Sequence, residues 1–181
     1  MHSLEHLISL PLRRLAEALE SCVPAEADLE PAQWLSVVEL LTMRLDQGFV
    51  DLPTEYQRTC SAAFTRTLNN AVAVGAIDHH ESVVRRLNLS LILLRRVPPS
   101  DQLEMLDSER LLSLLLREVP LSIEEARILS SDWRTRDIAE IRTLRRAKNL
   151  LSPGLAIAKL VSAEKMEPEL KAWEQIFPML P

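Results

Sequence analysis

A cluster of arginines in residues 132–151 is the feature whose residue types most directly suggest binding chemistry. A guanidinium keeps its charge at physiological pH and grips carboxylates or phosphates through paired hydrogen bonds. At about 100° per residue, one helix over this range would gather its arginines within a third of its circumference, apart from an apolar sector that includes Trp133 and Leu144. The arginines predicted to form this face are Arg134, Arg142, Arg145 and Arg146.

Such a face predicts binding to an acidic patch on another protein, with phosphates or an anionic membrane surface as further candidates. The alternative is a solvated face whose arginines pair with acids of neighbouring helices, such as Glu109 and Glu118. Nucleic acid is not the expected partner, because no aromatic residues interleave with the arginines and the chain has a net charge of −5. A nucleic-acid-associated regulator that uses the 132–151 helix is the first rival interpretation.

Histidines occur in two pairs that suggest metal binding, His2 with His6 and His79 with His80. Two histidines with nearby carboxylates are able to hold Zn or Fe. However, His2 lies at a terminus that would fray, and adjacent residues of a helix point in different directions. We therefore expect polar side chains at helix starts, no metal site and no cofactor.

Motifs of catalysis are missing from the sequence. The chain has 3 Gly, all isolated, so neither a phosphate-binding loop nor a dinucleotide fingerprint occurs. No Gly-x-Ser-x-Gly elbow occurs either. The adjacent carboxylates Glu124 and Glu125 suit a helix N-terminus, where they complement the helix dipole. We expect no catalytic residues and a protein that is not an enzyme; a helical ligand-binding protein or enzyme is the second rival.

Length and composition predict one globular domain over residues 1–181. Hydrophobic residues make up 47% of the 181 residues, and aromatic residues only 4%. A chain of this length buries roughly 70% of the surface that its unfolded form exposes, which is enough for a core. The excess of acidic side chains lies in the first 80 residues, whereas the remainder is close to neutral.

Cysteine use and the lack of targeting signals predict a cytoplasmic protein. Cys22 and Cys60 are far apart and form no Cys-x-x-Cys motif, so we expect two buried thiols in a reducing compartment. The N-terminal residues lack the basic region and the long apolar run of a secretory signal. No stretch has the 18 or more apolar residues of a membrane span.

Frequent proline and rare glycine predict helices separated by proline stops, with 11 Pro against 3 Gly. Pro11 should interrupt the first helix, Gly48 and Gly75 should end two others, and Ser122 should cap a further one. The Ser152-Pro153-Gly154 sequence should break the chain between two late helices. Helices are expected over 3–21, 31–48, 53–75, 78–97, 100–120, 122–129, 132–151, 155–165 and 168–177.

These elements predict an all-α fold of about nine helices, either a compact orthogonal bundle or an irregular stack of helical hairpins resembling a degenerate helical repeat. The middle of the 78–97 helix, Leu87 to Leu94, is apolar almost all round, so this helix should lie buried at the centre. Pro98-Pro99 is the clearest break, so any boundary between subdomains should fall at 98–100.

The C-terminal helix carries an apolar stripe that includes Trp173 and Phe177. It must pack either into the core of the chain or against a partner, where aromatic residues are favoured anchors. Together with the arginine face, this stripe predicts a protein–protein interaction module: an adaptor, a chaperone or a regulatory subunit of a larger assembly. Self-association is left open. An apolar groove or terminal helix would supply affinity, and the arginines would supply register and on-rate.

Overall fold

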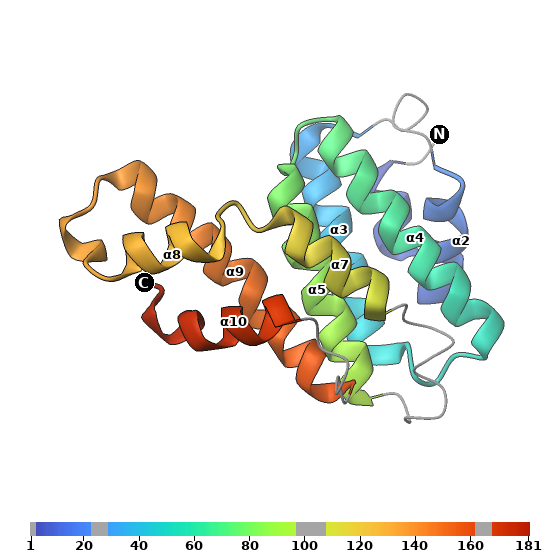
Figure 1. Ribbon diagram of the computed structural model, residues 1–181. Coiled ribbons are helices and arrows are strands. Elements are labelled where there is room, and N and C mark those ends of the chain that lie inside the picture. Colours follow the sequence, from blue (N-terminus) through green and yellow to red (C-terminus); the bar gives the residue numbers. More distant parts are fainter. Residues whose placement is uncertain (1–2, 23–28, 97–107, 162–167) are drawn as a thin grey trace. The chain divides into compact units, whose positions relative to one another are not determined.

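The computed structural model describes residues 3–22, 29–96, 108–161 and 168–181, without the side chains of residues 108 and 109. Within these ranges the chain forms nine α-helices and two short 3-10 helices, and no strand (Figure 1). The predicted all-α fold class is therefore confirmed. No helix in these ranges is long and apolar enough to cross a lipid bilayer.

The described residues divide into two compact units. Unit 1 comprises the residues up to Ser82 together with Arg96, and unit 2 comprises Val83–Arg95 and the residues from 108 onward. Compact clustering does not establish that either part folds alone, so the single domain over 1–181 stays a prediction. The candidate boundary at 98–100 lies outside the described residues.

Unit 1 is built on contacts between helices that are not all neighbours in sequence. α2 packs against α3 and α4, α3 packs against α4, and α1 packs against α3. Trp34, Leu41 and Leu68 are fully buried on the inward faces of these helices. The helices of unit 1 are α1 (Leu4–Ser9), α2 (Leu12–Glu20), α3 (Pro31–Gly48) and α4 (Thr54–Ala73).

Gly75 ends α4 in the left-handed conformation that the sequence predicts, with φ of 73°. The Ala76 N–H donates to the Ala71 carbonyl at 2.8 Å, and the Gly75 N–H donates to the Val72 carbonyl at 3.0 Å. This pair of bonds is the Schellman motif, which satisfies carbonyls that a helix end would otherwise leave open.

Two further predictions about helix ends have opposite outcomes. The interruption at Pro11 is confirmed, because α1 ends at Ser9 and α2 begins at Leu12. The left-handed stop at Gly48 is wrong: Gly48 is the last residue of α3, and Phe49 continues in the right-handed helical region. The Phe49 N–H still donates to the Leu45 carbonyl at 3.1 Å, so the α3 end needs no residue with positive φ.

α5 (His79–Arg96) is buried around most of its circumference, as its apolar sequence predicts. Val83, Leu87 and Leu94 belong to the core of unit 2. Leu89 and Leu93, on another side of the helix, are also buried.

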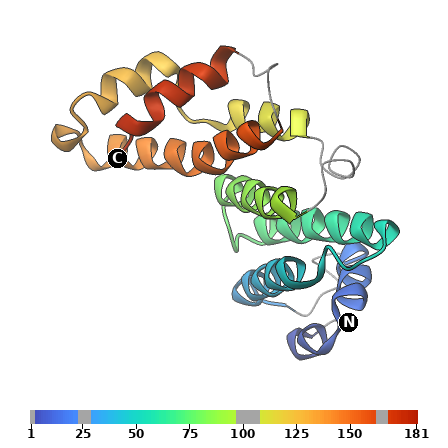
Figure 2. The same cartoon turned by 90° about the horizontal axis from the view of Figure 1, so that it is seen from below.

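Unit 2 surrounds a core that is mainly leucine, with alanine, isoleucine, one valine and one tryptophan. α9 packs against α7, α8 and α10, and α10 also packs against α8 (Figure 2). Its remaining elements are α7 (Ser108–Glu118), α8 (Ile123–Ser130), η2 (Trp133–Thr135), α9 (Ile138–Leu160), α10 (Pro168–Ile176) and η3 (Phe177–Met179).

The predicted break at Ser152-Pro153-Gly154 is wrong, because α9 runs through it without interruption to Leu160. Pro153 has no N–H to donate and its ring crowds the preceding turn, at a cost of ~3 kcal/mol in a helix interior. Burial offsets this cost. Pro153 and Gly154 are both buried, and Leu155, Ile157 and Ala158, which follow them, lie in the core of unit 2.

Candidate functional site

The N-terminus of α9 is fixed by a capping box that sequence reasoning missed. The Glu140 N–H donates to Asp137 Oδ1 at 2.8 Å, and the Asp137 N–H donates to Glu140 Oε2 at 3.3 Å. The helix therefore begins at Ile138, and the predicted start at residue 132 is wrong. The spacing Asp-x-x-Glu is the signal that would have located this start.

The inward face of α9 determines which side chains the helix presents to solvent. Leu144, Ala147 and Leu151 are fully buried in the core of unit 2. At 100° per residue, the opposite side of the helix is one continuous exposed face. We call this face the basic stripe; it comprises Ile138, Arg142, Arg145, Arg146 and Asn149, all exposed.

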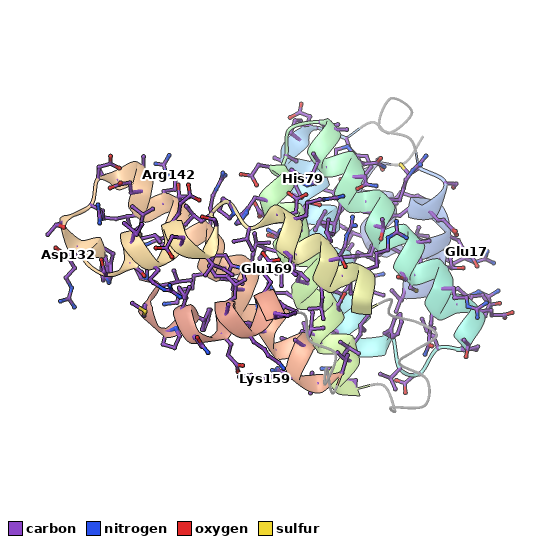
Figure 3. The ribbon with its side chains drawn as sticks, viewed as in Figure 1. Glu17, His79, Asp132, Arg142, Lys159 and Glu169 are labelled. Atoms are coloured by element: carbon purple, nitrogen blue, oxygen red, sulfur yellow. The ribbon has the colours of Figure 1, made fainter. Side chains whose placement is uncertain are left out.

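The basic stripe is not neutralised by carboxylates of its own helix. Glu140 is the one acidic residue of α9, and it folds back into the capping box on another side of the helix. Arg142 and Arg145 form no ion pair within the described part of the chain. Arg146 already has an interaction within the chain. Figure 3 shows Arg142 in the first half of α9.

The alternative interpretation names Glu109 and Glu118 as acids that pair with the arginines. Glu118 Oε1 lies 3.8 Å from Arg117 Nε on its own helix α7, and Glu118 has another interaction within the chain. The side chain of Glu109 lies outside the described residues. For Arg142 and Arg145, the described part of the chain offers no acidic partner, so their charges face solvent.

The prediction that Arg134 shares a helix face with the other arginines is wrong. Arg134 lies in η2, before α9 begins, and its guanidinium sits 5.5 Å from the centroid of the Trp133 ring. Arg136 is also outside α9, and its Nη2 donates to the Ile128 carbonyl at 3.1 Å. These two arginines therefore hold and cover the turn between α8 and α9.

Lys148 is a structural residue of α9. It is half-buried, and its Nζ donates to the Leu180 carbonyl at 2.9 Å. This bond ties the segment after α10 to the middle of α9. Lys148 therefore does not contribute to the charge of the basic stripe.

An exposed apolar side chain stands at the head of the basic stripe. Ile138 is 77% exposed, the highest value among the exposed large hydrophobic residues of the described ranges. Ile128, at the end of α8, is 53% exposed. Sequence reasoning placed Ile138 in no site, although helix periodicity alone puts this residue on the same side as Arg142 and Arg145.

The structure places the C-terminal aromatic residues in or against the core of unit 2. Trp173 is 1% exposed and is a member of that core, together with Ile176 and Leu180. Phe177 is half-buried and packs against the same cluster. The apolar stripe of the C-terminal helix therefore packs into the core of the chain, which is one of the two possibilities that the sequence left open. Trp173 and Phe177 lie in α10 and η3, whereas the basic stripe lies on α9.

Histidine and cysteine side chains form no assembled site in the described residues. No group of three or more His, Cys, Asp or Glu side chains is arranged there to hold a metal ion. His2 lies outside the described residues, and His79 and His80 each have an interaction within the chain. Cys22 and Cys60 are buried and form no disulfide. Burial raises the pKa of the Cys60 thiol to about 11, which suppresses the nucleophilic thiolate.

Comparison of the chain with protein-family models, with curated proteins and with solved structures gave no match. By its fold and its surface, the described part of the chain is an all-α protein of two compact helical units, with a basic stripe on one long helix. Any proposal about its function rests on these residues alone.

Proposed function

We propose that this chain is a non-enzymatic protein-binding subunit, an adaptor, chaperone or regulatory component, that recognises an acidic patch on another protein through the basic stripe. The observation that carries the proposal is the exposure of Arg142 and Arg145 on a face with no carboxylate of its own. Exposed arginines of this kind are able to form paired bonds with the carboxylates of a partner.

Ile138 supports a protein partner over a simple counter-ion. An isoleucine that is 77% exposed loses apolar contact with water when a partner covers it. Burial of such a side chain contributes roughly 1.5–3 kcal/mol when it is complete. The arginines would then steer encounter and fix register, whereas Ile138 would contribute to affinity.

Charge reversal on the basic stripe tests the proposal. The double variant Arg142→Glu/Arg145→Glu is compared with wild type in affinity capture from the source lysate, with nuclease present and at low salt. The matched control, Arg117→Glu/Lys171→Glu, reverses two exposed charges of unit 2 that lie off α9. We expect a stoichiometric protein partner with wild type and the control, and its loss with the stripe variant.

The remaining measurements separate the rivals. Binding of the purified partner should weaken through its on-rate as salt rises, and Ile138→Asp should raise its off-rate. If nuclease removes every bound component, the stripe serves the nucleic-acid-associated regulator instead. If the stripe variant captures the same partner as wild type at low salt, the basic stripe is not the binding surface and the proposal fails.

A further inference from the structure

The turn between α3 and α4 presents an apolar and an acidic side chain at the surface of unit 1. Val50 is 43% exposed, and Asp51, the next residue, is exposed as well. Both lie in a turn that is closed by the Leu52 N–H, which donates to the Phe49 carbonyl at 3.2 Å. Gln57 Nε2, from α4, donates to the same carbonyl at 3.2 Å. These two bonds fix the turn to α4 and hold Val50 and Asp51 at the surface.

Glu55 adds a second carboxylate beside this turn. It is exposed in the first turn of α4, four residues after Asp51. A carboxylate there complements the helix dipole, but it still presents its charge to solvent. In the described ranges, neither Asp51 nor Glu55 forms an ion pair. We call Val50, Asp51 and Glu55 the acidic tip.

The acidic tip and the basic stripe are complementary in charge and in the order of their residues. The stripe begins with Ile138, which is 77% exposed, and continues with Arg142 and Arg145 on the same side of α9. The tip likewise begins with an exposed aliphatic side chain and continues with two charges. Arginine and carboxylate form strong paired hydrogen bonds, and mutual burial of the two aliphatic side chains removes apolar surface from water. Each surface therefore supplies what the other lacks.

We propose that the basic stripe is occupied by the acidic tip of a second copy of this chain. The inference rests on the proposed function, because it names the acidic patch that the stripe recognises. The excess of acidic side chains in the first 80 residues favours the same pairing, since their field attracts the arginines of another copy. The contact is heterologous, because tip and stripe are different surfaces. Few side chains take part, so the association should be weak and sensitive to salt.

Charge reversal in the full chain tests this pairing, with sedimentation velocity at low salt over a range of protein concentrations. The stripe variant is Arg142→Glu/Arg145→Glu, and the tip variant is Asp51→Arg/Glu55→Arg. Each double reversal changes the net charge of −5 by four, to −9 for the stripe variant and −1 for the tip variant. The matched controls reach the same net charges by reversing exposed side chains elsewhere: Arg117→Glu/Lys171→Glu and Glu20→Arg/Glu169→Arg.

We expect wild type and both controls to associate, with a mean mass that rises with protein concentration and falls as salt is added. The stripe variant and the tip variant should each associate at least tenfold more weakly, because like charges then face each other. An equimolar mixture of these two variants should recover the association, since the unchanged tip of one meets the unchanged stripe of the other. Net attraction cannot explain that recovery, because both variants carry a negative net charge.

Wild type that stays monomeric at every concentration, or a tip variant that associates like wild type, would overturn the proposal, as would a mixture that fails to recover. Should the tip variant fail to fold, Asp51→Asn/Glu55→Gln removes the same charges without reversing them, and it too should weaken the association.

The tip variant also separates this inference from the proposed function, because it leaves the basic stripe intact. If wild type does not self-associate, but the tip variant captures a different protein that the stripe variant loses, the second copy is wrong and the proposed function stands. If the stripe variant both self-associates and captures partners like wild type, both proposals fail.

Discussion

Gly154 of α9 lies so close to Leu115 of α7 that no β-carbon fits between them. A Cβ built at Gly154 would overlap Leu115 Cδ2 and would stand 3.2 Å from Leu115 Cγ. Leu115 is fully buried, so it has little space in which to move. The glycine therefore allows α7 and α9 to approach each other, in a helix interior where glycine is otherwise unfavourable by about 1 kcal/mol.

Gly154→Ala should destabilise the protein, against the usual effect of this substitution in a helix. The overlap with Leu115 forces a side-chain or backbone shift in a packed core, which costs about 1–3 kcal/mol. This cost exceeds the ~1 kcal/mol that alanine gains over glycine in a helix. Chemical denaturation monitored by circular dichroism measures the free energy of unfolding and gives the sign directly.

Gly48→Ala is the matched control for that experiment. Gly48 also lies in a helix, as the last residue of α3, and its φ is not positive. The nearest atom to a Cβ added there is Leu12 Cδ2 at 3.5 Å, which is an ordinary contact. This variant should be neutral or stabilised by up to about 1 kcal/mol. A stabilised Gly154→Ala would mean that α7 and α9 do not approach each other as closely as described.

Asp137→Ala should weaken the start of α9, whereas Asp132→Ala should not. The Asp137 carboxylate accepts the Glu140 N–H at 2.8 Å, and loss of such a cap costs about 1 kcal/mol. Asp132 precedes η2, and its side chain makes no capping bond there. Denaturation of both variants checks the prediction. Equal losses, or a larger loss for Asp132→Ala, would restore the helix start that the sequence first suggested.

The helices that could be predicted from the sequence are those whose ends are decided locally. Pro11, Gly75 and the Ser122 cap act through the backbone of the next few residues, so their effects are visible in the sequence. In the structure the Glu125 N–H donates to Ser122 Oγ at 3.2 Å, as predicted. The continuity of α9 through Pro153 was not predictable in this way, because burial of later residues in a distant core decides it.

The candidate site was predictable only where it depends on helix periodicity. Arg142, Arg145 and Arg146 share a face in any helix that includes them, wherever that helix begins. Arg134 depends on the start at Ile138 and was misplaced for that reason.

The Cys60 thiol should make stability fall as pH rises from 9 to 11. Burial raises the pKa of this thiol from 9.0 to about 11 in the folded chain. The folded state therefore binds the proton more tightly than the unfolded state, so stability that is present below pH 9 is lost as pH rises toward 11. The free energy of unfolding should decline by at most ~1.4 kcal/mol per pH unit from this source. Urea denaturation at a series of pH values measures it.

Cys60→Ala isolates this contribution. Every other ionisable group is present in both proteins, so the difference between the two curves reports Cys60. The variant should lose stability overall and show a shallower decline above pH 9. In native wild type, Cys60 should also resist a thiol reagent at pH 8. Parallel pH curves for the two proteins would contradict the assigned burial.

Replacing Trp173 separates a core role from a partner-binding role. Trp173 is a core residue that is only 1% exposed. Its replacement by alanine should therefore lower the free energy of unfolding by about 3–5 kcal/mol. Phe177→Ala should cost less, because Phe177 is only half-buried. Denaturant unfolding of each variant gives these values in the isolated protein.

Trp173→Phe refines the same experiment. The Trp173 Nε1 is buried and has no hydrogen-bond partner, so phenylalanine removes an unsatisfied donor while it keeps much of the apolar contact. Its loss of stability should therefore be well below that of alanine. If Trp173→Ala instead unfolds like wild type but loses a binding partner, α10 presents Trp173 outward in solution, and the C-terminal helix becomes a docking element in place of a core element.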